Sequence, residues 1–325
     1  MENKVLLDVK NLHVHYVTAE TTAKAVNGID FEVCEGEALG LVGETGAGKT
    51  TTALSIMQLI PDPPGIIVDG EINFEGNNVI YNTDKQNQHM RGNGIAMIFQ
   101  DPMTALNPIM TVGAQLSEVV LTHEKVSKAE AKKRVIDLLE IVGVKSDRYD
   151  DYPHQFSGGQ KQRVVIAMSL LCNPRLLISD EPTTALDVTI QAQVLDIINQ
   201  LREKYKMSMI LITHDLGVVA ETCDNVAIMY AGQIVEKGTV REVYLHPKHP
   251  YTRGLFDSIP KLDDDATELI PIEGSISNAA DLPSGCHFHP RCRYCQEICK
   301  KEQPPQRGDG HKFMCHFDLF SKEEE

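Results

Sequence analysis

The stretch that most constrains this chain is residues 43–50, which read Gly-Glu-Thr-Gly-Ala-Gly-Lys-Thr and fit the pattern G-x-x-x-x-G-K-[ST]. A short apolar run at 38–42 precedes it, as a buried strand would, and residues 51–59 have the pattern of a helix. Glycines let the backbone curl so that successive N–H groups point inward, and the helix N-terminus adds the positive end of its dipole. The stretch therefore predicts a site for nucleotide phosphates between a strand and a helix.

Two side chains of this loop have predicted roles of their own. Lys49 would reach the β- and γ-phosphates, and the Thr50 hydroxyl would ligate Mg²⁺. The alternative is a glycine-rich strand-to-helix turn that binds nothing, which the Lys-Thr pair and the preceding strand disfavour. The nucleotide contacts predicted here are Gly43, Glu44, Thr45, Gly46, Ala47, Gly48, Lys49, Thr50 and Thr51.

Composition narrows the class of protein. The chain has 325 residues, enough for one large domain and something smaller. Its formal net charge is −15 without a basic block, which argues against nucleic acid as a partner. No apolar run approaches the ~20 residues that span a bilayer, and the N-terminus has no signal-peptide pattern. We therefore expect a cytosolic chain whose eight cysteines are thiols or metal ligands rather than disulfides.

Two polar or aromatic residues end predicted strands. Residues 5–17 alternate in polarity, as a half-buried strand does, and residues 25–33 predict a second strand of the same small sheet. Tyr16 ends the first strand, where it would either pack on a core or stack on a nucleotide base. The apolar strand at 95–99 is followed by Gln100, whose amide would complete a Mg²⁺ shell and position a water, or would be a surface amide.

From about 108 to 170 the pattern becomes helical, with a capping box predicted at Ser127 and Glu130. Further on, Ser157 stands where an N-cap belongs, and the two glycines after it leave the N–H groups of the first turn unobstructed. Residues 157–160 therefore predict a second anion-binding helix terminus, with a plain Ser-Gly-Gly loop as the alternative.

Two acids end another buried strand, at 176–182. Asp180 would hold Mg²⁺ through water, and Glu181 would polarise an attacking water. A further strand at 208–213 is followed by His214, a position where a lone histidine is more often structural than catalytic.

In their order along the chain, these segments resemble the motifs of ATP-binding cassette (ABC) ATPases over about residues 1–240. The matching elements are the Walker A loop at 43–50, the Q-loop Gln100, the signature residues Ser157, Gly158, Gly159 and Gln160, the Walker B residues Asp180 and Glu181, the D-loop Asp187 and the switch His214. The resemblance implies that ATP and Mg²⁺ are the cofactors, that Tyr16 stacks on adenine and that His214 senses the γ-phosphate. Phe156, Thr45 and Ala47 depart from the usual residues, but no charged or metal-ligating position is altered. An active ATPase is therefore implied.

The resemblance also implies a fold. We expect an α/β P-loop cassette with a mixed or parallel core sheet, a small antiparallel sheet and an inserted helical subdomain at about 105–170. The nucleotide-binding domain would cover residues 1–245, and a Cys-rich C-terminal extension would cover 246–325.

Beyond residue 245 the chain is similar to the ATP-binding subunits of dipeptide and oligopeptide importers, in particular the first of the two paired subunits. The residues that carry this likeness are His249, Pro250, Tyr251, Thr252 and the stretch 258–262, together with the cysteines of the tail. The implied partners are a second cassette in a homo- or heterodimer, two membrane permeases and, indirectly, an extracellular substrate-binding protein, with the chain peripheral on the cytoplasmic face of the membrane. The alternatives are an importer of nickel or another small solute, a non-transport cassette ATPase and a catalytically inactive subunit.

The tail contains five cysteines, and cysteine clustering in a cytosolic chain points to a metal. The family pattern selects Cys286, Cys292, Cys299 and Cys315, which resemble the ligands of a [4Fe–4S] cluster. The departure is Cys295, which creates a C-x-x-C half-site suited to Zn²⁺. Spare ligands for that alternative are His287, His289 and His316, and a set of thiols without metal is the third alternative.

Overall fold

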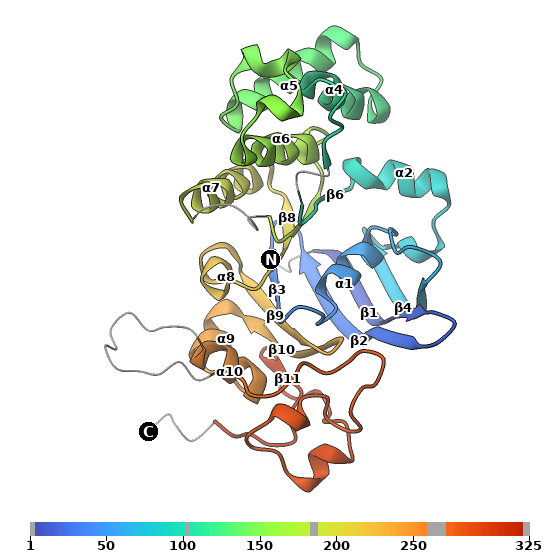
Figure 1. Ribbon diagram of the computed structural model, residues 1–325, viewed down its shortest axis with the longest axis vertical. Coiled ribbons are helices and arrows are strands. Elements are labelled where there is room, and N and C mark those ends of the chain that lie inside the picture. The colour runs from blue at the N-terminus through green and yellow to red at the C-terminus, as the bar shows by residue number, and fades with distance from the viewer. Residues whose placement is uncertain (1–3, 102–104, 183–187, 259–270, 321–325) are drawn as a thin grey trace. The chain divides into compact units, whose positions relative to one another are not determined.

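The computed structural model describes residues 4–101, 105–182, 188–258 and 271–320 (Figure 1). These residues form two compact units. The first contains the described residues within 1–6, 33–38 and 78–212, and the second contains those within 7–32, 39–77 and 213–325.

A small antiparallel sheet begins the second unit, with the strand order β2-β1-β4-β5. Leu7 and Val9 of β1 are buried, and after a register shift between Lys10 and His13 the buried positions continue as Leu12 and Val14. The observed strands β1 and β2 confirm the two strands expected at 5–17 and 25–33. The bounds are β1 (Val5–Val17), β2 (Thr22–Cys34), β4 (Gly65–Phe74) and β5 (Asn77–Asn78).

Four further strands of this unit follow the order β11-β10-β9-β3. They are β3 (Ala38–Val42), β9 (Asn225–Tyr230), β10 (Gln233–Thr239) and β11 (Lys312–Phe313). β3 is parallel to β9, whereas β10 is antiparallel to both β9 and β11. β9 and β10 thus form a hairpin that turns at Ala231 and Gly232, and β11 joins the C-terminal tail to the sheet.

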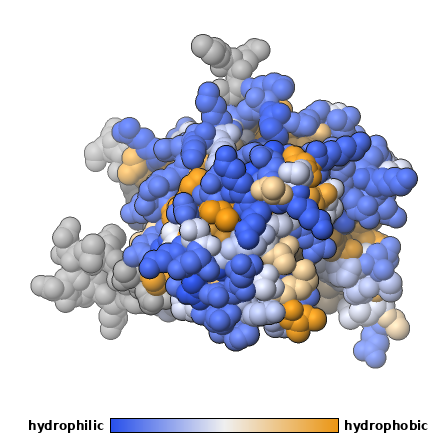
Figure 2. Space-filling model, turned by 90° about the horizontal axis from the view of Figure 1, so that it is seen from above, coloured by the Kyte–Doolittle hydropathy of each residue, from blue (hydrophilic) through white to orange (hydrophobic). Residues whose placement is uncertain are grey.

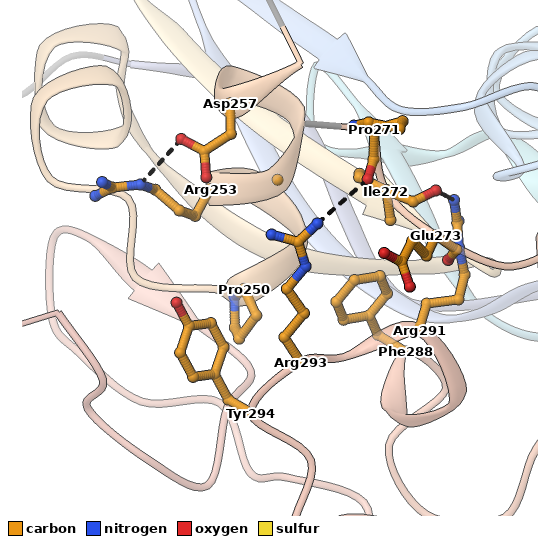
Figure 3. A pocket seen from close by; sticks show the side chains of 11 residues that line it. Pro250, Arg253, Asp257, Pro271, Ile272, Glu273, Phe288, Arg291, Arg293 and Tyr294 are labelled. Atoms are coloured by element: carbon orange, nitrogen blue, oxygen red, sulfur yellow. Dashed lines mark hydrogen bonds and ion pairs between the residues drawn. The ribbon is translucent and has the colours of Figure 1, made fainter. Parts of the chain in front are cut away.

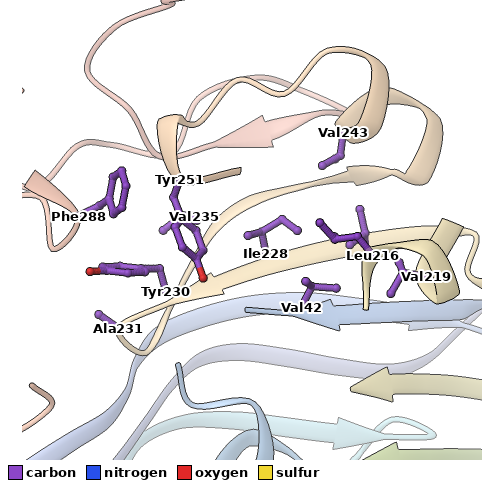
Figure 4. Packing of buried hydrophobic residues seen from close by; sticks show 11 residues of the cluster. Val42, Leu216, Val219, Ile228, Tyr230, Ala231, Val235, Val243, Tyr251 and Phe288 are labelled. Carbon is purple, nitrogen blue, oxygen red and sulfur yellow. The ribbon is translucent and has the colours of Figure 1, made fainter. Parts of the chain in front are cut away.

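The helices of the second unit are short. They are α1 (Lys49–Ile56), α8 (Leu216–Thr222), α9 (Val240–Leu245) and α10 (Pro250–Asp257), with 3₁₀ turns η4 (His289–Arg291) and η5 (Glu297–Lys300) in the tail. A buried cluster links α10 and the tail to β9. Within it Tyr230, Tyr251 and Phe288 pack ring against ring (Figure 4).

The first unit contains three parallel strands in the order β8-β7-β6, namely β6 (Ile95–Ile98), β7 (Leu176–Asp180) and β8 (Ser208–Thr213). Its α-helices are α2 (Asp84–Asn93), α4 (Val112–His123), α5 (Lys128–Ile141), α6 (Gly158–Leu170) and α7 (Val188–Tyr205), and its 3₁₀ turns are η1 (Val79–Tyr81), η2 (Ser146–Asp150) and η3 (Pro153–Gln155). Figure 1 shows α4, α5 and α6 gathered together, as their mutual contacts require. These features confirm the α/β fold, with parallel and antiparallel pairing in the core strands and a separate small antiparallel sheet.

The two predicted helix caps differ in the structure. Ser157 and Gln160 form a full capping box, in which each side chain accepts from the backbone N–H of the other residue. Ser127 accepts from the Glu130 N–H, but the Glu130 carboxylate accepts from Arg134 one turn later. The prediction at Ser127 is therefore right for the N-cap and wrong for the reciprocal bond.

The surface seen in Figure 2 is mostly hydrophilic, with hydrophobic side chains in small scattered groups. Within the described residues, no helix combines the length and the apolar character needed to cross a membrane.

Candidate functional site

The loop at 43–50 connects β3 to α1 and needs its glycines for close packing. Gly48 has a φ of +102°, and a Cβ there would lie 2.5 Å from the Ala25 carbonyl oxygen. A Cβ on Gly43 would lie 2.2 Å from the Met229 carbonyl oxygen. A side chain at either position would therefore displace the loop from the strands beneath it.

Lys49 begins α1 and is nearly buried within this loop. Its Nζ donates to the carbonyl oxygens of Gly43, at 2.6 Å, and Glu44, at 3.1 Å, so the ammonium lies over the loop. No side chain caps the helix at Gly48. The loop therefore combines an ammonium group with a helix N-terminus that lacks a side-chain acceptor, which is the arrangement that favours a phosphate.

Tyr16, at the end of β1, lies beside the start of the same helix. Its hydroxyl is 3.4 Å from Thr51 Oγ1, and the residue is half-buried. A Cβ on Gly65 would approach the Tyr16 ring to 2.9 Å, so this glycine makes room for the aromatic side chain. The structure thus brings the predicted adenine-stacking residue next to the phosphate loop.

In the first unit, the structure brings Gln100 and Glu181 together. Gln100 Nε2 donates to Glu181 Oε2 at 3.1 Å. Glu181 has a left-handed φ of +46°, which is costly for a residue with a Cβ, and its N–H donates to the Ile212 carbonyl oxygen at 2.8 Å. Asp180, the preceding residue, is buried at the end of β7. The predicted water-activating acid is therefore held by its backbone and by the predicted Q-loop amide.

The predicted signature segment forms the exposed N-terminus of α6 in the same unit. Ser157 and Gly158 are exposed, and a Cβ on Gly158 would meet no atom within 4 Å. The Gln160 side chain is occupied by the capping box, so its predicted contact with nucleotide stays a prediction. Phe156, which departs from the family pattern, is buried, and the Arg148 guanidinium lies 4.3 Å from the centre of its ring.

The remaining predicted residues of the ATP site are placed less fully. His214, which directly follows β8, is exposed and belongs to the second unit, and Asp215 after it caps α8. Asp187 lies outside the described residues. The structure therefore describes the phosphate loop, Tyr16 and His214 within one unit, and the signature, Q-loop and Walker B residues within the other.

Four cysteines of the tail line one small apolar cavity of about 10 Å³. They are Cys286, Cys292, Cys299 and Cys315. Burial raises the pKa of the Cys286 thiol to about 11 and that of the Cys292 thiol to about 12. Cys295 is not among the lining residues. Within the described part of the chain, no group of three or more His, Cys, Asp or Glu side chains is placed to hold a single metal ion.

Sequence reasoning missed a contact between this tail and the phosphate loop. Arg291 forms a bidentate ion pair with Glu44, although the two residues are 247 positions apart. The Glu44 carboxylate, bonded to the guanidinium, raises the pKa of Arg291 above its ordinary value. Glu44 therefore has protein partners besides its predicted contact with nucleotide.

Comparison with known proteins identifies the family. Residues 26–184 match the family model described as ABC transporter, and residues 235–299 match the model described as oligopeptide/dipeptide transporter, C-terminal region. The chain is 51% identical over 303 residues to the oligopeptide transport ATP-binding protein OppD of Bacillus subtilis, an alignment covering 92% of this chain and 85% of that protein. It is 43% identical over 318 residues to the dipeptide transport ATP-binding protein DppD of Escherichia coli, with 97% of each covered. The chain belongs to the ATP-binding subunits of dipeptide and oligopeptide ABC transporters.

Solved structures agree with this assignment. The cassette cbiO1 of Clostridium perfringens, part of the ABC transporter complex cbiONQ, has a TM-score of 0.65 and 28% identity, covering 75% of this chain and 92% of that chain. The dimeric bacterial ABC transporter cassette MJ0796 also has a TM-score of 0.65, at 25% identity, covering 72% and 99%. The ABC cassette fold predicted from the sequence is thus confirmed.

As an ABC transporter ATPase, this subunit binds ATP with Mg²⁺ and hydrolyses ATP to drive transport. The predictions of an ATP hydrolase and of a transporter subunit are confirmed. Lys49 and the uncapped N-terminus of α1 lie in one loop of the second unit.

Proposed function

We propose that this subunit powers the import of dipeptides or oligopeptides. What carries the proposal is the combination, in one chain, of a complete phosphate loop with a C-terminal tail that matches peptide transporters at 235–299. The peptide itself would be bound elsewhere in the transporter. The ATPase subunit would act on it indirectly, by changing conformation with its nucleotide.

The nucleotide would be held mainly by the second unit. Lys49 would exchange its bonds to the Gly43 and Glu44 carbonyl oxygens for bonds to the β- and γ-phosphates. The exposed Thr50 hydroxyl would ligate Mg²⁺, and Tyr16 would stack on adenine beside Thr51. These roles follow from the buried lysine and the aromatic residue that flank one helix terminus.

Glu181, Asp180 and Gln100 would take part in hydrolysis. Glu181 would accept a proton from the attacking water, and Asp180 would hold Mg²⁺ through water. The Gln100 bond to Glu181 fixes the carboxylate before substrate arrives. Gln100 would exchange this bond for a contact with Mg²⁺ and the water, while His214 would contact the γ-phosphate.

A second cassette would complete the site. The Ser157 end of α6 is exposed, and a Cβ on Gly158 would meet no atom within 4 Å, so this capped helix N-terminus is sterically accessible and would bind the γ-phosphate held by the partner cassette. The relative MJ0796 was solved as a dimer, which supports the same arrangement here. Two permease subunits would receive the motion at the cytoplasmic face of the membrane, and an extracellular substrate-binding protein would deliver the peptide.

The tail would hold a [4Fe–4S] cluster. Four thiols line one apolar cavity, the ligand number of such a cluster, whereas a single ion would need its ligands to converge to about 2.3 Å from one point. The cluster's contribution would be to crosslink the tail through its four cysteine ligands, because no residue of the tail enters the hydrolysis described above. Cys286, Cys292, Cys299 and Cys315 would be the ligands, and the Zn²⁺ alternative would use Cys295.

Transport is tested by expressing this subunit with the permeases, second cassette and binding protein of its transporter, and measuring uptake of labelled dipeptide, pentapeptide and nickel. Peptide uptake that requires ATP and Lys49 supports the proposal. Uptake of nickel without peptide would contradict it.

The metal is tested on anaerobically purified full-length protein. We expect a brown protein with about four irons per chain, the content of this cluster type. Cys286→Ser, Cys292→Ser, Cys299→Ser and Cys315→Ser should each bleach the protein. The matched control, Cys295→Ser, should leave colour and iron unchanged. A colourless protein whose zinc disappears with Cys295→Ser would refute the assignment.

A further inference from the structure

The phosphate-loop residue Glu44 is held by the C-terminal part of the chain at two points. Arg291 Nη1 donates to Glu44 Oε2 at 2.6 Å, and Nη2 donates to Oε1 at 3.1 Å. The Glu44 N–H donates to the hydroxyl of Tyr251 at 3.0 Å, and Tyr251 is fully buried. Side chain and backbone of one loop residue are therefore both fixed by α10 and the tail.

The ion pair is built into the protein rather than lying on its surface. The Arg291 side chain is only 4% exposed, whereas that of Glu44 is 26% exposed. Arg291 Nε also donates to the Glu273 carbonyl oxygen at 3.1 Å, and the guanidinium carbon lies 5.7 Å from the centre of the Tyr230 ring. Parallel bonds from a guanidinium fork to a carboxylate fix orientation as well as charge.

The same contact continues to the residues that would touch phosphate. The Glu44 carbonyl oxygen accepts from Lys49 Nζ, so a shift of Glu44 moves an acceptor of the phosphate-binding lysine. On the other side, Arg291 directly precedes Cys292, which lines the cysteine cavity, and lies near Phe288 (Figure 3). Packed and bonded residues thus run from the tail to the phosphate loop within one unit.

We propose that Arg291 is a positioning residue for ATP binding: it neutralises and orients Glu44, so that nucleotide affinity depends on the docked tail. Without Arg291, the Glu44 carboxylate would be an unpaired negative charge beside a triphosphate. Like charges at short range in a partly desolvated site oppose each other strongly. Arg291 would therefore act through Glu44 without touching nucleotide itself.

The test measures Mg-ATP affinity of the purified full-length chain with a fluorescent ATP analogue. We expect Arg291→Gln to weaken binding about tenfold, within the 5- to 150-fold range of coupling between sites. Arg291→Lys should lose less, because it keeps the charge but not the fork. The matched control is Arg293→Gln in the same segment, since Arg293 bonds only weakly to the Pro271 carbonyl oxygen, at 3.5 Å (Figure 3). That variant should stay within about twofold of the wild type.

The decisive variant is Arg291→Gln combined with Glu44→Gln. If the unpaired carboxylate weakens binding, removing it should recover most of the affinity that Arg291→Gln loses. Loss of affinity through unfolding of the tail would not be reversed by a change in the loop. A double variant as weak as Arg291→Gln alone, or an Arg291→Gln variant with wild-type affinity, would overturn the proposal.

The proposal rests on ATP binding and not on the transported solute. Because the assay uses the isolated chain without permeases or peptide, it can succeed when peptide uptake fails. The two failures are therefore distinguishable.

Discussion

Replacing Phe288 by Ala should release the C-terminal tail from the rest of the second unit, in particular from β9 and α10. Phe288 is 3% exposed, and its ring centre lies 5.1 Å from that of Tyr230 and 5.4 Å from that of Tyr251 (Figure 4). A third ring, that of His249, lies at 5.7 Å. Truncation would leave a cavity walled by three rings that are themselves packed, so the space cannot close by a simple shift of one neighbour.

The expected cost is about 3–5 kcal/mol, the range for removing a buried phenyl ring. A chain with more than one compact unit need not unfold in one step, so the loss should be measured locally. The Met314 amide reports the docked tail, because its N–H donates to the Val235 carbonyl oxygen of β10. The Phe313 amide, whose N–H donates to the Arg307 carbonyl oxygen, reports the folding of the tail itself.

Native-state hydrogen exchange should show these two amides exchanging roughly 100- to 5,000-fold faster in Phe288→Ala, as 3–5 kcal/mol implies. Tyr294→Ala is the matched control, because Tyr294 belongs to the same tail but is 46% exposed. A change below about 1 kcal/mol in Phe288→Ala, or an equal change in the control, would refute the reasoning.

Three further outcomes follow from the geometry. Glu181→Gln should retain Mg-ATP binding but stop steady-state hydrolysis in the assembled transporter, because the attacking water loses its base. Lys49→Ala should instead weaken nucleotide binding itself. Hydrolysis by Glu181→Gln near the wild-type rate would exclude Glu181 as the base. In a mixed dimer of cassettes, Ser157→Arg in one chain should inactivate the site whose phosphate loop belongs to the other chain, and loss at the mutated chain's own loop would exclude the head-to-tail arrangement. Burial lowers the pKa of His249 from 6.5 to about 4. Between pH 6.5 and pH 4 the unfolded state therefore binds more protons than the folded state. As the pH falls through this range, the docked tail should lose stability, by at most about 3 kcal/mol. Replacing His249 by Asn, which can still cap α10, should flatten this acid dependence in the hydrogen exchange of the tail.

The sequence by itself determined the features that depend on local patterns. The glycines and Lys49 predicted the phosphate loop, because a curled backbone before a helix has few sequence solutions. Alternation predicted β1, and its change of phase after Val9 coincides with the register shift between Lys10 and His13. Ser157 predicted the start of α6, because an N-cap bonds within its own first turn.

Where the sequence pattern was weak, an element was missed or was predicted only in part. The helix α2 was missed because it is strongly polar, with Met90 as its buried residue, although Thr83 and Gln86 form a capping box that could have marked its start. At α5 the sequence identified the cap Ser127, but the Glu130 carboxylate binds Arg134. The choice between two polar partners of one exposed side chain depends on small energy differences that no periodicity reveals.

Only the tertiary structure decided how the tail is used. The sequence offered five cysteines, and the fold placed four of them around one cavity with Cys295 outside its lining. It also joined Arg291 to Glu44 across 247 positions. An ion pair of this kind leaves no local pattern, because its geometry depends on the hairpin of β9 and β10, the start of α10 and the pairing of β11 together. The chain order specified the phosphate loop, but the packing of α10 and the tail onto it determined which side chains hold Glu44 in place.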